Sequence, residues 1–260
     1  MQQSFAVPTL SLVCLAASAG LAILVPMALL IGCRVRYGRG LKAAAVGALC
    51  FFVGAMVLET LVHQVVFALF PALPYVPAAY VLYGCLAAGL FEETARLIGL
   101  KLLCRKQPGW VTGLSYGIGH GGFESMAMVG LSLVANLYLM LLLNGGADPA
   151  ALGLTDAQTS ALAAVDPTSF LWAGAERLMS IGLHIALSLL IWMVVVRRLP
   201  GWFYWVSVGL HALANVGAAL YQCGVWTSLA GVELWTLAGS VLAAVLVRRW
   251  MKKTAPAARV

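Results

Sequence analysis

Seven apolar segments, each long enough to cross a lipid bilayer as a helix, occupy most of this 260-residue chain. A membrane-spanning helix needs about 20 consecutive, mostly apolar residues. The predicted spans are 10–32, 43–69, 77–102, 110–143, 169–196, 202–222 and 229–247. The sequence therefore predicts an all-α, polytopic transmembrane helix bundle of about seven spans. We expect a single integral-membrane domain over 1–260, with its catalytic-like core at about 77–222.

The composition agrees with a membrane protein and argues against soluble classes. Only 10% of the residues are charged and 62% are hydrophobic, whereas soluble domains carry about 25% charged residues. The net charge of +7 comes from short basic clusters between apolar runs, so we expect no nucleic-acid partner. The six cysteines form no CxxC pair, which argues against a disulfide framework or a thiolate zinc site. Because MQQSFAVPTL lacks a basic residue, we expect the first run to be a retained span, not a signal peptide.

The basic residues predict the orientation of the bundle. Fourteen of the 16 Lys and Arg residues fall in alternate loops and in the basic tail 248–260, so all of them lie on one side. By the positive-inside rule, the N-terminus is outside and the C-terminus is cytoplasmic. The largest loop, 144–169, then faces outside. No segment outside the membrane is long enough for a separate catalytic domain, so any chemistry belongs within the membrane.

Four consecutive predicted spans carry polar side chains that are costly in hydrocarbon. One charged side chain at the bilayer centre costs about 2.5–3.5 kcal/mol, and such residues are functional by default. Counted inward at about 1.5 Å per residue, most of them lie about 14–21 Å below the cytoplasmic surface. We therefore expect one shared site near the midplane. Its members are Glu92, Glu93, Arg96, His120, Glu124, His184, His211 and Asn215.

The spacing of these residues supports a shared site. Glu92 and Arg96, like His211 and Asn215, are four residues apart and so share a helix face. Glycines at 113, 117 and 121 form a small-residue face that lets neighbouring helices approach the fourth span.

Other buried polar residues lie nearer the outer face. They are Glu59, His63, Glu176 and Arg177. We interpret Glu59 and Arg177 as a structural ion pair, and the alternative for the four residues is a role in substrate entry or gating.

Three imidazoles with nearby carboxylates are the ligand types of a zinc or similar divalent site. Catalytic zinc takes three such protein ligands and leaves one position for water, while a carboxylate outside the ligand shell acts as general base. The side chains of Arg96 and Asn215 are suited to hold a polarised carbonyl or to orient that base. This set suffices for hydrolysis of an amide bond.

Four motifs on consecutive spans together resemble a known family. EETAR (92–96), HGGFE (120–124), HIALS (184–188) and HALAN (211–215) resemble, in this order, the YhfC family of intramembrane metalloproteases. That family is related to the PrsW and CAAX-protease/bacteriocin-processing superfamily. The resemblance covers about 43–222. Where the superfamily usually has Phe, this chain has His120.

The resemblance implies that Glu92 or Glu93 activates water, and that Glu124, His184 and His211 bind metal or polarise the substrate. We take His120, Glu124, His184 and His211 as the pool of metal ligands. Because the pool holds one ligand more than zinc needs, we expect one member, His120, to lie outside the ligand shell.

The predicted function is a metal-dependent intramembrane protease that cuts a membrane-embedded or membrane-proximal peptide or protein. The expected cofactor is a divalent metal, in the first place Zn²⁺, and the expected location is the bacterial cytoplasmic (inner) membrane. The alternatives are a metal-free glutamate-type hydrolase, a divalent-metal or proton transporter or channel, and a catalytically inactive membrane scaffold.

Overall fold

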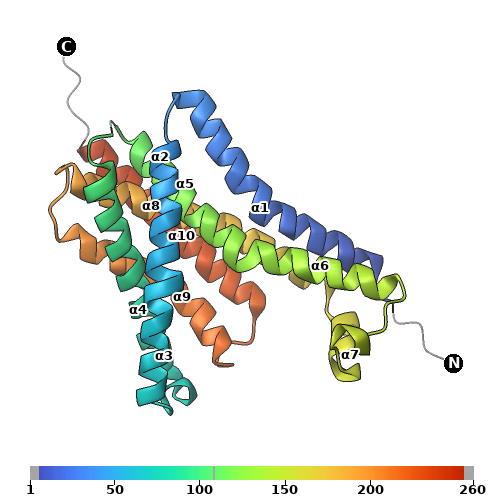
Figure 1. The fold of residues 1–260 in the computed structure, drawn as a ribbon. Coiled ribbons are helices and arrows are strands. Elements are labelled where there is room, and N and C mark those ends of the chain that lie inside the picture. The colour runs from blue at the N-terminus through green and yellow to red at the C-terminus, as the bar shows by residue number, and fades with distance from the viewer. Residues whose placement is uncertain (1–5, 108, 255–260) are drawn as a thin grey trace. The chain divides into compact units, whose positions relative to one another are not determined.

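The computed structural model describes residues 6–107 and 109–254, and every regular element in these residues is a helix. The α-helices are α1 (Thr9–Tyr37), α2 (Leu41–Phe51), α3 (Thr60–Leu69), α4 (Pro77–Ile98), α5 (Val111–Glu124), α6 (Leu131–Asn144), α7 (Asp156–Ala164), α8 (Pro167–Val195), α9 (Phe203–Gln222) and α10 (Leu229–Lys253). The π-helical stretches are η1 (Phe52–Glu59), η3 (Gly99–Cys104) and η4 (Ser125–Gly130), and the short 3₁₀ turns are η2 (Leu73–Tyr75) and η5 (Ala150–Leu152). Figure 1 shows the path of the chain.

The all-α, multi-pass prediction is confirmed. Six helical stretches among the described residues are long and apolar enough to cross a membrane, and they match six of the predicted spans within a few residues. The seventh, predicted at 77–102, is the helix α4 continued by η3, and it carries two glutamates, an arginine and a lysine. The predicted orientation stays a prediction, and the end of the basic tail, 255–260, lies outside the described residues.

Two compact units make up the described chain, and the prediction of a single domain remains untested. The first comprises residues 6–25 and Ser125–Leu178. In it, the Asn144 side chain accepts from the Val7 amide at 2.7 Å and donates to the Val7 carbonyl at 3.0 Å. The second unit comprises Pro26–Glu124 and residues 179–254, and it contains every predicted site residue.

Large apolar side chains point outward along the helices, as expected where the solvent is lipid. Leu24, Leu82, Leu131 and Leu234 are each more than 60% exposed, although each lies within a long helix. With many other large apolar side chains exposed along the long helices, these residues form apolar surfaces that suit acyl chains.

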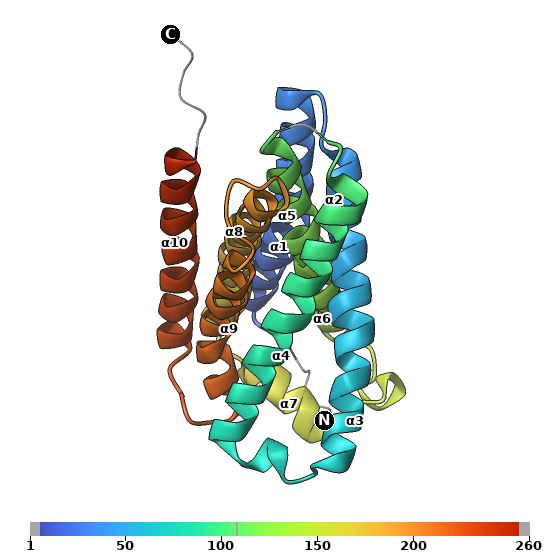
Figure 2. The same cartoon turned by 90° about the vertical axis from the view of Figure 1, so that its left-hand side faces the viewer.

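Within the second unit, α2 packs on α5, α4 packs on α9, and α9 packs on α10. The pairing of α9 with α10 can be followed in Figure 2. The contact of α2 with α5 depends on two glycines, one from each helix. A Cβ at Gly47 would overlap the Tyr116 carbonyl oxygen, and a Cβ at Gly119 would overlap the Ala44 carbonyl oxygen. Only glycine therefore permits this backbone approach, which places α5 beside α2 in the neighbourhood of His120.

We predict that Gly119→Ala lowers the stability of the folded protein by about 1–3 kcal/mol, because the added methyl group must push α2 away from α5. Thermal unfolding in detergent would measure the effect. Gly182→Ala on α8 is the matched control, since a Cβ there would meet no side chain and no neighbouring helix of the described chain within 4 Å. The control should be neutral or stabilising by up to about 1 kcal/mol because alanine favours helix. Equal melting temperatures for the two variants would contradict the close approach.

Candidate functional site

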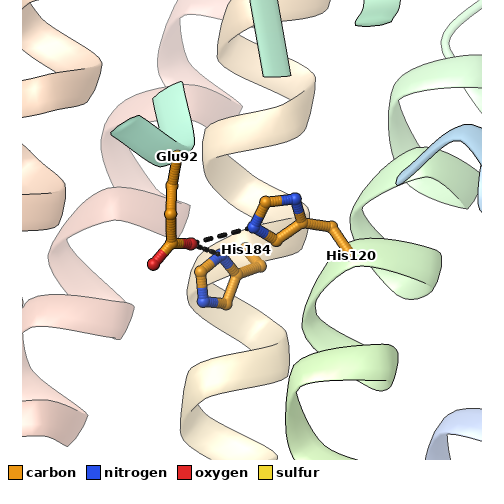
Figure 3. A group of neighbouring side chains, drawn as sticks. All are labelled: Glu92, His120 and His184. Atoms are coloured by element: carbon orange, nitrogen blue, oxygen red, sulfur yellow. Dashed lines mark hydrogen bonds and ion pairs between the residues drawn. The ribbon is translucent and has the colours of Figure 1, made fainter. Parts of the chain in front are cut away.

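Three helices bring one carboxylate and two imidazoles together inside the second unit. Glu92 comes from α4, His120 from α5 and His184 from α8, and Figure 3 shows the three side chains pointing toward one another. One potential ligand atom of each lies within 4.8 Å of the others, and all three residues are buried. Glu92 Oε2 is 2.9 Å from His120 Nε2 and 3.9 Å from His184 Nδ1.

The glycine face of α5 explains why His120 and His184 meet. A Cβ at Gly117 would lie 2.5 Å from the Ile185 Cα atom, and a Cβ at Gly121 would lie 2.9 Å from the His184 Cβ atom. Without side chains at these positions, α5 can approach α8 closely. The two imidazole rings consequently lie with their centroids 4.8 Å apart.

Arg96 is fully buried and connects α4 to α8. Its Nη1 donates to the His184 carbonyl oxygen and to Ser188 Oγ, both at 2.7 Å. Its Nη2 lies 3.2 Å from Glu93 Oε1, and neither side chain of this ion pair is exposed. Buried charges of this kind are tolerated when they are paired and hydrogen-bonded.

The surroundings of His184 fix its tautomer. Arg96 Nη2 lies 2.9 Å from His184 Nδ1, and a guanidinium can only donate, so Nδ1 accepts. The ring proton is then on Nε2, which lies 2.6 Å from Glu124 Oε2. Ser180 donates to the other oxygen of Glu124 at 3.2 Å. A carboxylate behind an imidazole in this way orients a metal-ligating histidine and raises its basicity.

His211 of α9 lies between the two adjacent glutamates. Its Nδ1 is 2.9 Å from Glu93 Oε1, and its Nε2 is 3.7 Å from Glu92 Oε1. Ser207, one helical turn earlier, donates to Glu93 Oε2 at 2.6 Å. Glu93 thus accepts from three donors, since Arg96 is the third. The arrangement leaves Nε2 of His211 facing the group formed by Glu92, His120 and His184.

The residues present fit a divalent metal ion. Two imidazoles and one carboxylate are a ligand set of catalytic zinc, whose ligand atoms lie about 3.3 Å apart in a tetrahedron with bonds of about 2.0–2.1 Å. The observed separations of 2.9 and 3.9 Å from Glu92 Oε2 lie on either side of that value. For His184 Nδ1 to bind a metal ion, its lone pair must be released from the hydrogen bond with Arg96 Nη2. Arg96 Nη2 then keeps Glu93 as its partner.

Comparison with known proteins agrees with the motifs. The family model described as YhfC intramembrane metalloprotease matches residues 21–236. This chain belongs to the YhfC family. It is 36% identical over 234 residues to a Bacillus subtilis (strain 168) protein named uncharacterized membrane protein YhfC, covering 86% of this chain and 90% of that protein. No solved structure matches the chain. The wider relation to PrsW proteins stays a prediction.

The structure brings together seven of the eight residues that the sequence analysis selected. The exception is Asn215, which is half-buried and, among the described residues, makes no side-chain hydrogen bond. The three residues close enough to hold one metal ion are Glu92, His120 and His184, whereas the sequence predicts His120 outside the ligand shell and Glu92 as a base. Two partners were missed, Ser188 and Ser207. Each is four residues from a site histidine, so the same helical spacing could have identified them.

The polar residues outside this group form separate pairs. Glu59 Oε1 lies 3.2 Å from His63 Nε2, and His63 Nδ1 is hydrogen-bonded to the Tyr83 hydroxyl group at 2.7 Å. Arg177 forms an ion pair with its neighbour Glu176. These local pairs support a structural role for the four residues, with His63 as the partner of Glu59 and Glu176 as the partner of Arg177, while the expected pair of Glu59 with Arg177 stays a prediction.

We predict that Arg96→Met destabilises the protein by about 3–5 kcal/mol, because it leaves Glu93 charged, buried and without its guanidinium partner. The double variant with Glu93→Leu should recover much of the loss, since it removes both charges. Thermal unfolding of the single and double variants in one detergent measures the coupling. Additive losses would contradict an ion pair.

Proposed function

We propose that this protein is a metal-dependent intramembrane hydrolase that cuts peptide bonds in a membrane-embedded or membrane-proximal substrate. The main observation in support of this proposal is the buried group of Glu92, His120 and His184, with His211 next to it. Family membership supports the reaction class. The Bacillus subtilis relative is named a membrane protein, and we propose the bacterial cytoplasmic membrane as the location of this chain.

In this proposal Glu92, His120 and His184 hold a divalent metal ion, in the first place Zn²⁺. Such an ion polarises a substrate carbonyl and makes water a stronger nucleophile at neutral pH. His120 is completely buried, and its Nδ1 has no hydrogen-bond partner among the described residues. Glu124 orients His184 from behind. The carboxylate behind His184 suits ligation by the imidazole nitrogen that faces the centre of the group, and His120 turns its Nε2 toward Glu92 at the same centre.

In our proposal His211 is the general base that accepts a proton from the attacking water molecule, whereas the sequence predicts Glu92 or Glu93 for this role. Glu93 is bonded to Arg96, His211 and Ser207, so it has little capacity to take a further proton from water. Its position instead holds Nδ1 of His211, as the carboxylate does in a carboxylate–histidine pair. Nε2 then faces the Glu92 carboxylate, on the side where a reacting water molecule would sit.

Asn215 remains the proposed contact for the substrate carbonyl. It lies one turn beyond His211 on α9 and is only half-buried. Because its amide has no partner among the described side chains, it is available to a bound peptide.

We predict that the purified protein carries one divalent metal ion per chain, measured by elemental analysis after removal of loosely bound metal. His120→Ala, His184→Ala and Glu92→Gln should each lower the metal content by at least about tenfold. His63→Ala is the matched control, since His63 pairs with Glu59 and Tyr83 instead. Metal content that stays at one per chain in all three site variants would contradict this ligand set.

We further predict that His211→Ala retains metal but loses at least about a hundredfold in hydrolysis, the usual contribution of a general base. The assay incubates proteoliposomes with a pool of hydrophobic synthetic peptides in H₂¹⁸O and detects ¹⁸O in new carboxyl termini by mass spectrometry. Parallel measurements of metal and proton flux test the transporter alternative. Metal flux without ¹⁸O incorporation would contradict hydrolysis, and cleavage that survives chelation would favour a metal-free glutamate-type reaction.

A further inference from the structure

A cavity of about 640 Å³ lies at the end of α4 and η3, next to the turn that joins α8 to α9. Its lining contains four basic residues, which are Lys101, Arg105, Arg197 and Arg198. The remainder of the lining is apolar, including Leu97 and Leu199. This cavity belongs to the second unit and shares no residue with the proposed metal site.

The positive charge of the cavity is not balanced by the protein. No carboxylate is part of the lining, and within 6–107 and 109–254 none of the four basic side chains forms an ion pair or a hydrogen bond. All four basic residues are exposed, and four like charges around one cavity repel one another. An anion in the cavity would remove this repulsion.

Arg197 provides a second, independent observation. It has a φ of 59° and is the sole non-glycine residue with positive φ among those described. The Arg198 amide donates to the Met193 carbonyl oxygen and the Arg197 amide donates to the Val194 carbonyl oxygen, so Arg197 occupies the left-handed position of a Schellman helix ending. Glycine fills this position without strain. A non-glycine residue is uncommon in this left-handed position, and here it adds a guanidinium group to the cavity lining.

We propose that this cavity binds a phosphate group. Arginine side chains suit phosphate because the planar guanidinium donates two parallel hydrogen bonds, and a lysine adds a compact charge. Two sources share this chemistry, an anionic phospholipid headgroup and free phosphate. Neighbouring Leu102 and Trp202 are 71% and 59% exposed, which suits acyl chains and the membrane interface beside a lipid headgroup.

The test uses the full chain purified in a non-ionic detergent and titrated with dioctanoyl phosphatidylglycerol or with inorganic phosphate, with thermal stabilisation as the readout. We expect saturable binding of at least one probe. Lys101→Gln combined with Arg105→Gln should raise the Kd by about 25-fold, at about fivefold per cation. Arg249→Gln combined with Lys253→Gln is the matched control, because it removes the same charge from residues that do not line the cavity. Binding of phosphatidylglycerol alone identifies lipid as the source, and equal binding of both identifies the free anion.

Arg197→Gly separates binding from folding. The variant should melt at the same or a higher temperature, because glycine relieves the strained backbone, and yet raise the Kd about fivefold. A lower melting temperature with an unchanged Kd would show that Arg197 serves the helix ending and would overturn the proposal. The proposal also fails if neither probe saturates, or if the Arg249 and Lys253 control loses as much affinity as the cavity variant.

Discussion

The site depends on one buried ion pair, that of Glu93 with Arg96. Both side chains are inaccessible to solvent, and both come from the same face of α4. Through its other donors Arg96 reaches the backbone and side chains of α8, and Glu93 reaches His211 and Ser207 on α9. The pair therefore does more than neutralise charge, because it connects α4 to both neighbouring helices and orients two of the three site histidines.

The three histidines differ in their hydrogen-bond partners, and these partners suit them to different roles. Arg96 and Glu124 determine which nitrogen of His184 carries the proton, and Glu93 does the same for His211. His120 instead approaches Glu92 directly, at 2.9 Å, and is brought there by a glycine-rich helix face. The surroundings of His120 and His184 suit metal ligands, and those of His211 suit a general base. Metal-assisted hydrolysis requires both kinds of group in one site.

The sequence predicted the helices, and its helical spacing predicted that most of the selected polar residues lie together, whereas the roles of these residues remain proposals. Span limits follow from apolar length, and the gathering of Glu92, His184 and His211 follows from depth and helical spacing. Neither depth nor spacing states how each helix is rotated. The rotation decides that Glu93 accepts from Ser207, that His120 approaches Glu92, and that Asn215 makes no side-chain hydrogen bond among the described residues. Similarly, the free-energy cost of a charged side chain in hydrocarbon predicts that Arg96 has hydrogen-bond partners. It does not predict that Ser188 is one of these partners.

X-ray absorption spectroscopy of the zinc-loaded protein tests the central claim most directly, because it reports the ligand atoms of the ion itself. The proposed site predicts two imidazole nitrogens and two oxygens at about 2.0–2.1 Å, with one imidazole lost in His184→Ala and no change in His63→Ala. Sulfur scattering at about 2.3 Å, or a shell of oxygens without imidazole, would contradict a metal centre built from Glu92, His120 and His184.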